Sequence, residues 1–359
     1  MRRPVYSLRE LAAYFLRLGV VGFGGPAAHI ALMERDCVTD RQWIARQRFL
    51  DVLGAANLIP GPTSTELAMH IGYVRAGVPG LIVAGACFIL PAAIMAAVLA
   101  AVYVRAGAVP ALDDMLRAVK PVVIVVVLFA AVSLARAALR NVRLVVVGSL
   151  ALMLILAGVN EVAVLLLAGA FNAIAVRLGA RHIQSVVLLP DLFAYFVKAG
   201  ATVLGSGYVL FAILRADLVH GAGWITEAQL LDAIAVGQMT PGPVFTAATF
   251  IGYLVGGTAG AVVATVGVFL PAFVFSGMSA RYLERLEHLP AARRVLDGIN
   301  AAAVVLIGVV LAALVPHAIV DWQTLAIALA AALLIGWLRV NAAWVILAAA
   351  ATAAAVPLL

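Results

Sequence analysis

The chain has 359 residues, of which 65% are hydrophobic and 11% are charged, and its mean hydropathy is +1.12. No soluble core of this size needs so much apolar surface, so the composition excludes a soluble globular protein and predicts an all-α polytopic membrane protein. The net charge of +7 is spread through the loops and not clustered. It argues against nucleic-acid binding and is compatible with an anionic cargo.

The sequence repeats itself after about 180 residues, first at a shift of 181 and later at a shift of 180. The matching pairs are Phe15 with Phe196, Gly19 with Gly200, Trp43 with Trp224, Ile71-Gly72-Tyr73 with Ile251-Gly252-Tyr253, and Gly80 with Gly260. So many matches in a fixed order indicate a duplication. We therefore divide the chain into two transmembrane repeats, residues 1–181 and 182–359.

Each half has the same predicted elements in the same order. A broken helix comes first, at 8–33 and 191–214, and a polar loop that carries a tryptophan follows it. A segment interrupted by Pro-Gly-Pro comes next, at 44–77 and 225–257, and we interpret it as a re-entrant hairpin. The further spans are 79–104, 118–138, 143–158 and 161–178 in the first half, and 258–280, 298–315, 323–338 and 341–358 in the second.

The loop charges favour inverted repeats. If the hairpin does not cross, each half crosses the membrane five times, and an odd number turns the second half upside down. The loop 34–48 of the first half carries four arginines, and its counterpart in the second half carries only Arg215. The bias is reversed at the loop 281–294 of the second half, which carries four arginines, whereas its counterpart at 105–120 is more mixed in charge. Positive loops lie in the cytoplasm. The arginines near the N-terminus, such as Arg9, disagree unless the first segment lies in the interface, or dips into the membrane and returns.

The two Pro-Gly-Pro interruptions are the first candidate site. Asn57 lies three residues before Pro60-Gly61-Pro62, and Gln238 lies three residues before Pro241-Gly242-Pro243. Paired prolines remove backbone donors and stop a helix, and a bilayer tolerates such a break only where protein or water satisfies the backbone. Paired interruptions in two halves point to a transporter's binding site. The two amide side chains bind substrate or satisfy the broken backbone beside them.

A glycine cluster in each first helix adds to this site. The clusters are Gly24-Gly25 and Gly205-Ser206. Such glycines allow close helix packing or turn backbone amides toward a ligand, and the N-terminal ends of half-helices attract anions. Arg17 and Lys198 occupy matching positions just before them. Ionisable groups within apolar spans suggest a functional site, and snorkelling of each long side chain to a headgroup is the alternative.

Polar residues follow the first Pro-Gly-Pro only. Thr63 and Glu66 have the spacing of a helix capping box, which is the structural interpretation. In the functional interpretation Thr63 and Ser64 bind an oxyanion, and Glu66 or His70 carries a proton. The matching stretch of the second half, Val244-Phe245-Thr246, has neither an acid nor a histidine. Proton carriage would therefore belong to one half.

Known enzyme signatures are missing from the sequence. There is no Walker A sequence, no His-Glu-x-x-His and no Gly-x-Ser-x-Gly, and Cys37 and Cys87 have no metal-binding spacing. We therefore expect no cofactor, and transport would have to draw on an ion gradient or the membrane potential unless a separate ATPase partner supplies the energy. An intramembrane enzyme is the alternative from another class, and it would need a nucleophile and a base on facing helices.

The motifs resemble those of one known family. Phe23-Gly24-Gly25-Pro26, followed by Pro60-Gly61-Pro62 and Ile71-Gly72-Tyr73, is similar to the pattern of the chromate ion transporter family. The second copy and the length are similar to its long-chain, two-domain members. The resemblance covers nearly the whole chain, although Ser206 and Gly207 stand where the first copy has Gly25 and Pro26.

This resemblance implies a multi-pass protein of the bacterial inner membrane that exports chromate and confers resistance, driven by membrane potential or the proton gradient. The expected partners are chromate or a similar oxyanion and the lipid bilayer, with no nucleic acid; a homodimer stays open. Sulfate has the same charge and nearly the same shape as chromate. A carrier for sulfate or another anion, and a passive anion channel, are therefore the alternatives.

Overall fold

The computed structural model describes residues 7–56, 59–105, 110–139, 142–159, 163–165, 167, 189–203, 207–286 and 290–355. Within these ranges every regular element is a helix and none is a strand, which confirms the all-α prediction for this part of the chain. The predicted boundary between residues 181 and 182 lies outside the described residues and stays a prediction. We use first half and second half for the residues before and after it.

The first half contains α1 (Leu8–Val21), α2 (Gly25–Met33), η1 (Glu34–Asp40), α3 (Arg46–Ala56), α4 (Thr63–Arg105), α5 (Pro110–Ala138) and α6 (Val142–Leu156). The second half contains α8 (Leu189–Thr202), α9 (Val209–Leu214), η2 (Arg215–Gly221), α10 (Glu227–Met239), η3 (Val244–Thr246), α11 (Ala247–Leu286), α12 (Pro290–Ala318), α13 (Trp322–Ala332), η4 (Leu333–Trp337) and α14 (Ala342–Ala355). The bounds of α1 and α8, and of η1 and η2, differ by 181, and those of α5 and α12 differ by 180. The sequence repeat is thus also a repeat of elements.

Both α4 and α11 contain a sharp reversal with the same backbone angles. Gly77 has φ 64° and ψ −150°, and Gly257 has φ 60° and ψ −150°. Only glycine adopts such angles without strain. A Cβ placed on Gly72 would lie 2.3 Å from the carbonyl oxygen of Gly80, whereas residues eight apart in a straight helix are separated by about 12 Å. A short arm therefore folds back onto a long arm: 63–75 onto 78–105 in α4, and 247–255 onto 258–286 in α11.

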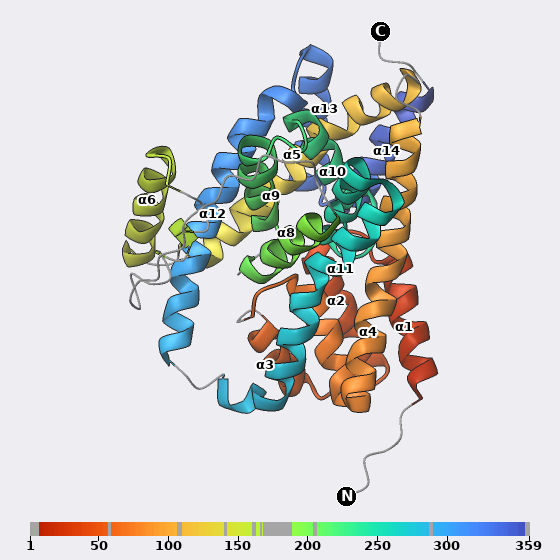
Figure 1. Cartoon of the computed structure of the whole chain (residues 1–359), viewed down its shortest axis with the longest axis vertical. Coiled ribbons are helices and arrows are strands. Elements are labelled where there is room, and N and C mark those ends of the chain that lie inside the picture. Colours follow the sequence, from red (N-terminus) through yellow and green to blue (C-terminus); the bar gives the residue numbers. More distant parts are fainter. Residues whose placement is uncertain are drawn as a thin grey trace, which may run out of the picture.

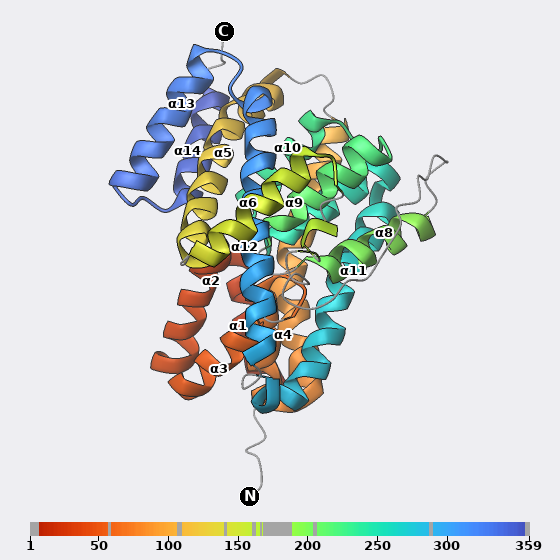
Figure 2. The same ribbon diagram turned by 90° about the vertical axis from the view of Figure 1, so that its left-hand side faces the viewer.

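The long arms of α4 and α11 run in opposite directions, as do α5 and α12 (Figures 1 and 2). In the part of the chain that the structure describes, four stretches are helical, long and apolar enough to cross a membrane: 63–105, 114–136, 244–280 and 297–318. They contain or largely overlap the predicted spans 79–104, 118–138, 258–280 and 298–315. Shorter apolar helices cover 144–156, 322–337 and 344–353, and the predicted span 161–178 lies mostly outside the described residues.

The first segment of the chain is a hairpin. α1 rises to the break at residues 22–24, and α2 leads back toward the end where α1 began (Figure 2). The Arg41 guanidinium, just after η1, lies 3.4 Å from the Glu10 carboxylate near the start of α1. This geometry matches the alternative in which the first segment dips into the membrane and returns, because the positive φ of Gly24 and Gly25 lets the backbone reverse. The number of crossings in each half stays a prediction. Arg9 thus lies at the same end as Arg41, and the disagreement in the loop charges disappears.

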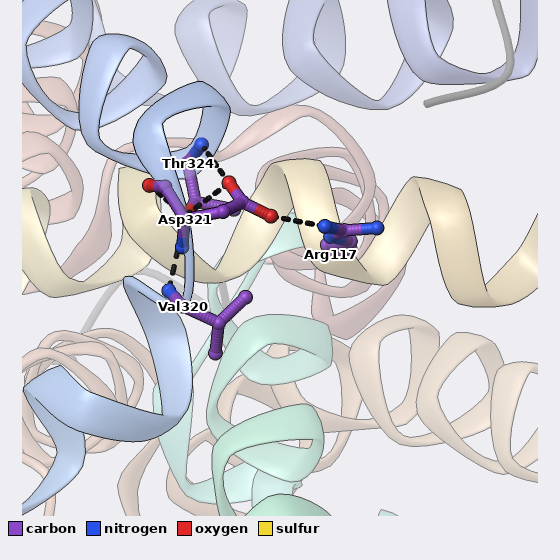
Figure 3. Close-up of polar contacts among 4 residues, drawn as sticks. All are labelled: Arg117, Val320, Asp321 and Thr324. Carbon is purple, nitrogen blue, oxygen red and sulfur yellow. Dashed lines mark hydrogen bonds and ion pairs between the residues drawn. The ribbon is translucent and has the colours of Figure 1, made fainter. Parts of the chain in front are cut away.

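Contacts between the halves include an ion pair at the start of α13 (Figure 3). One carboxylate oxygen of Asp321 accepts the backbone N–H of Thr324 at 2.8 Å, and the other accepts from the Arg117 guanidinium of α5. Asp321 therefore caps α13 and also joins that helix to the first half.

Candidate functional site

One backbone hydrogen bond joins each Pro-Gly-Pro turn to the helix break of the other half. The Gly61 N–H donates to the Val203 carbonyl at 2.8 Å, and the Gly242 N–H donates to the Gly22 carbonyl at 2.9 Å. Both the donors and the acceptors differ by 181 positions, so the two bonds are equivalents. They bring together the described residues at the four backbone breaks, which we call the central cluster: residues 22–24, 60–62, 203, 207–208 and 241–243.

The central glycines have no room for a side chain. Gly61 has φ 140° and Gly242 has φ 96°, values that L side chains rarely adopt. A Cβ on Gly242 would lie 2.8 Å from the Ala92 Cβ, and a Cβ on Gly61 would lie 3.2 Å from the Ala272 Cβ. Each turn therefore packs against the long arm of the opposite half, and this explains why both copies keep a glycine between the prolines.

Glu66 lies at the start of the short arm of α4, directly beside Gly61. Its side chain is fully buried, and a Cβ on Gly61 would lie 2.5 Å from Oε1. Neither carboxylate oxygen has a hydrogen-bond partner in the described part of the chain. The capping-box interpretation is therefore wrong. α4 begins at Thr63 after Pro62, and a proline at the cap position has no N–H for the acid to accept.

His70 links the short arm of α4 to the long arm of α11. Its Nδ1 lies 2.7 Å from the Glu66 carbonyl oxygen, and its Nε2 lies 3.0 Å from the Ser279 hydroxyl. Because a carbonyl only accepts, Nδ1 carries the hydrogen, and Nε2 is left to accept from Ser279 in the neutral ring. Ser276, one turn earlier, is also fully buried. These side chains form a polar strip through an otherwise apolar interface.

His29 is a buried residue in contact with the central cluster, and the sequence did not reveal it. Its Nε2 donates to the Gly22 carbonyl at 2.7 Å, the same oxygen that accepts from Gly242, and its Nδ1 lies 3.4 Å from the Ser64 hydroxyl. The side chain is fully buried in α2. One polar residue in an apolar helix was the only signal, and no second histidine exists at the matching position, Leu210.

Gln238, which was predicted from its spacing, lies at the end of α10 and reaches the helix breaks. Its side chain is hydrogen-bonded to the Tyr208 hydroxyl, and a Cβ on Gly25 would lie 3.4 Å from that same hydroxyl. Gln238, Tyr208 and Gly25 are therefore neighbours across the two halves. The corresponding predictions for Asn57, Gly205 and Ser206 lie outside the described residues.

The two predicted cations, Arg17 and Lys198, are exposed, unlike the buried side chains around the central cluster. Arg17 is exposed on α1. Lys198 is also exposed on α8, and its Nζ lies 3.2 Å from a carboxylate oxygen of Asp217. Exposure on a membrane protein's surface is compatible with snorkelling to a headgroup. A place for either cation in a substrate path stays a prediction.

Comparison with known proteins identifies the family. The family model described as "Chromate transporter" matches twice, at residues 9–173 and 190–354. The chain is 36% identical to a chromate transport protein of Cupriavidus metallidurans, over 91% of this chain and 87% of the relative. It is 33% identical to a chromate transport protein of Pseudomonas aeruginosa, over 85% and 80%, and 32% identical to a probable chromate transport protein of Synechococcus elongatus, over 84% and 82%.

No solved structure matches the chain. The apolar helices and the transporter relatives make it a multi-pass membrane protein, of a family of transporters and not of enzymes. The motifs and the two matches of the family model agree with one another: this chain belongs to the chromate transporter family.

Proposed function

We propose that this chain is a secondary active transporter that exports chromate across the bacterial inner membrane through the central cluster. The observation that carries the proposal is the pair of reciprocal hydrogen bonds, Gly61 to Val203 and Gly242 to Gly22. Broken helices from two repeats that meet in the middle of the molecule are the usual architecture of a transporter's substrate site. The names of the curated relatives favour chromate as the substrate.

The two halves act as inverted repeats, each with a re-entrant Pro-Gly-Pro hairpin. In support, the long arms of α4 and α11 run in opposite directions, and each short arm leads away from the central cluster (Figure 1). The arginine-rich segment around η1 and the C-terminal end of α11 lie at the same end of the molecule (Figure 1). Positive loops face the cytoplasm, so we assign this end to the cytoplasm.

The central cluster suits a tetrahedral dianion. α2 begins at Gly25 and α4 begins at Thr63, next to two of the breaks. Helix N-termini carry unpaired N–H groups and the positive end of the helix dipole, and both favour an anion. The hydroxyls of Thr63 and Ser64 and the amide of Gln238 add donors. A sulfate carrier would use the same groups, which keeps it as the second candidate.

Glu66 couples transport to protons in this proposal. A buried carboxylate without a charged or hydrogen-bonding partner is costly, so this conformation holds Glu66 as the neutral acid. A change that brings Glu66 to water favours the ionised form and releases the proton. His70 and Ser279 extend the polar strip away from the cluster. The second half has no equivalent acid, so one half carries the proton.

Everted membrane vesicles test the proposal, because export appears as uptake. Chromate uptake against a gradient should collapse when the membrane potential and the proton gradient are dissipated. Uptake that persists would contradict active coupling and favour a passive channel. Competition by sulfate and molybdate then separates the substrates: half-inhibition by sulfate at a far lower concentration than unlabelled chromate requires would make sulfate the substrate.

A further inference from the structure

A second polar group lies inside a predicted span, away from Glu66. The Lys120 ammonium of α5 lies 2.8 Å from one carboxylate oxygen of Asp232 on α10, and the Tyr103 hydroxyl of α4 donates to the other oxygen at 3.1 Å. The Lys120 and Asp232 side chains are 18% and 4% exposed. Lys120 belongs to the span 114–136. Ionisable groups within a span are expensive and are functional-site candidates by default.

The architecture does not require this ion pair, because the equivalent positions of the other half lack it. Lys120 corresponds to Asn300, and Asp232 corresponds to Asp51. The Asp51 carboxylate accepts instead from Gln47 on its own helix, at 2.9 Å. The helix α12 begins and ends 180 residues after α5 begins and ends, so the two helices are equivalents. The same helix therefore forms without a cation at this position.

The pair lies next in sequence to residues that line a small apolar cavity. Val123 and Ile124 follow Lys120 by one helical turn on the same face, and Leu231 is next to Asp232. These three residues, with Ile234 and Tyr208, line a narrow apolar cavity that has room for about one water molecule. Tyr208 also contacts Gln238. A line of neighbours thus leads from Lys120 to the cluster, and a dianion cannot pass along it in this conformation.

A second cation lies near Lys120 on the same helix. Arg117 lies one turn before Lys120 on α5, and it pairs with Asp321 at the start of α13 (Figure 3). The first half therefore supplies two cations at successive turns, and the second half supplies an acid for each. Arg117 corresponds to Asp297 in α12, so this feature is also absent from the other copy.

We propose that Lys120 is a substrate-binding residue of the transport path, at which the dianion replaces Asp232 as the partner of the ammonium. Asp232, which accepts a hydrogen bond from Tyr103, pairs with the cation when no anion is bound, because a bare cation in the bilayer is costly. Opening of the apolar cavity admits the anion, and its departure returns Lys120 to Asp232. This role rests on the proposed function, since it concerns the path of the same oxyanion.

The test compares two charge-neutral double variants in vesicles. Lys120→Met with Asp232→Asn removes the pair without leaving a buried charge, which is often tolerated by folding. The control, Arg215→Gln with Glu227→Gln, removes another partly buried pair, in which a guanidinium nitrogen lies 2.6 Å from the acid at the start of the same helix α10. We expect the first variant to lose chromate uptake about tenfold or more, the size of a lost charge-assisted hydrogen bond, with thermal unfolding unchanged and the control active. Uptake at the wild-type rate would overturn the proposal.

A single variant adds a second readout, the kinetics of uptake. Asp232→Asn retains a hydrogen-bonding group for Tyr103 but leaves the ammonium without its charged partner. The KM for chromate should fall severalfold and the maximal rate should also fall, because the anion binds more tightly and leaves more slowly. A lower rate with unchanged KM would mean that the pair only supports the fold. If the wild type itself does not take up chromate, the proposed function fails, whereas wild-type uptake with unaffected variants rejects only Lys120.

Discussion

The two Pro-Gly-Pro regions share a backbone but not their side chains. Gly61 and Gly242 make equivalent hydrogen bonds to the opposite half, and the reversals at Gly77 and Gly257 differ by only a few degrees. Around the first turn, however, lie the buried acid Glu66 and two buried histidines, whereas the stretch Val244–Ala247 after the second turn has no acid or histidine. Duplication thus supplied a symmetric frame, and the chemistry was placed on one side of it.

The largest expected effect comes from removing the single acid. Glu66→Gln keeps the shape of the neutral acid but cannot release a proton. Active uptake of chromate should fall by about two orders of magnitude, the scale on which a positioned proton-transferring group acts in enzymes. Uptake into vesicles, measured with and without an imposed proton gradient, checks this. The control is Glu34→Gln, which neutralises a half-exposed acid of the same half that pairs with Arg46. Near-normal, gradient-dependent uptake by Glu66→Gln would mean that the acid of the first half has no special role.

The shared frame makes the opposite prediction for the two central glycines. Gly61→Ala and Gly242→Ala should destabilise the protein to a similar extent, because each has a positive φ and each new Cβ would meet an atom within 2.8 Å. We expect a cost of at least about 1 kcal/mol at each position, seen as a lower temperature of unfolding in detergent.

Gly54→Ala is the matched control for these two variants. Gly54 lies in the helix α3, and a Cβ there would have no neighbour within 4 Å, so alanine should leave the stability unchanged or raise it by about 1 kcal/mol. Strong destabilisation at only one of the two central glycines would show that the frame is less symmetric than its hydrogen bonds.

A smaller effect is expected where the first half reaches across to the second. Ser279→Ala removes the hydroxyl that contacts His70 Nε2 and leaves the ring hydrogen-bonded only at Nδ1. The loss of one such bond costs about 1 kcal/mol, so uptake should fall severalfold and not be abolished. Thr352→Ala is the control, because that exposed hydroxyl bonds only within its own helix α14. Equal uptake by both variants would mean that the Ser279 hydroxyl does not contribute to transport.

The backbone interruptions that the two halves share could largely be predicted from the sequence, and the pairing of their side chains could not. Prolines and glycines act locally, so the interruptions at 60–62 and 241–243 could be predicted from residue type and repeat spacing alone. The sequence left the fold of the first segment open between a crossing helix, an interfacial segment and a dip that returns, because a run such as Gly22–Gly25 permits a reversal without requiring one. His29 with Ser64, and His70 with Ser279, join residues 35 and 209 positions apart. Isolated polar residues in apolar helices carry no periodic pattern that would indicate such partners.

The smallest effect concerns the other asymmetric contact, at the start of α13. The backbone N–H of Thr324 and the Arg117 guanidinium lower the pKa of Asp321 from 3.8 to about 2. Because the folded pKa lies below the unfolded value, the ionised group stabilises the protein above about pH 4, and this contribution is lost as the pH falls from about 4 through 2. Asp321→Asn should therefore reduce the stability at neutral pH slightly and flatten its decline in that window, measured as unfolding temperature against pH. The first half already has an amide at the matching position, Asn141, so the variant makes the halves alike there. An unchanged acid profile would mean that other carboxylates govern acid unfolding, and that this contact between the halves adds little to the frame.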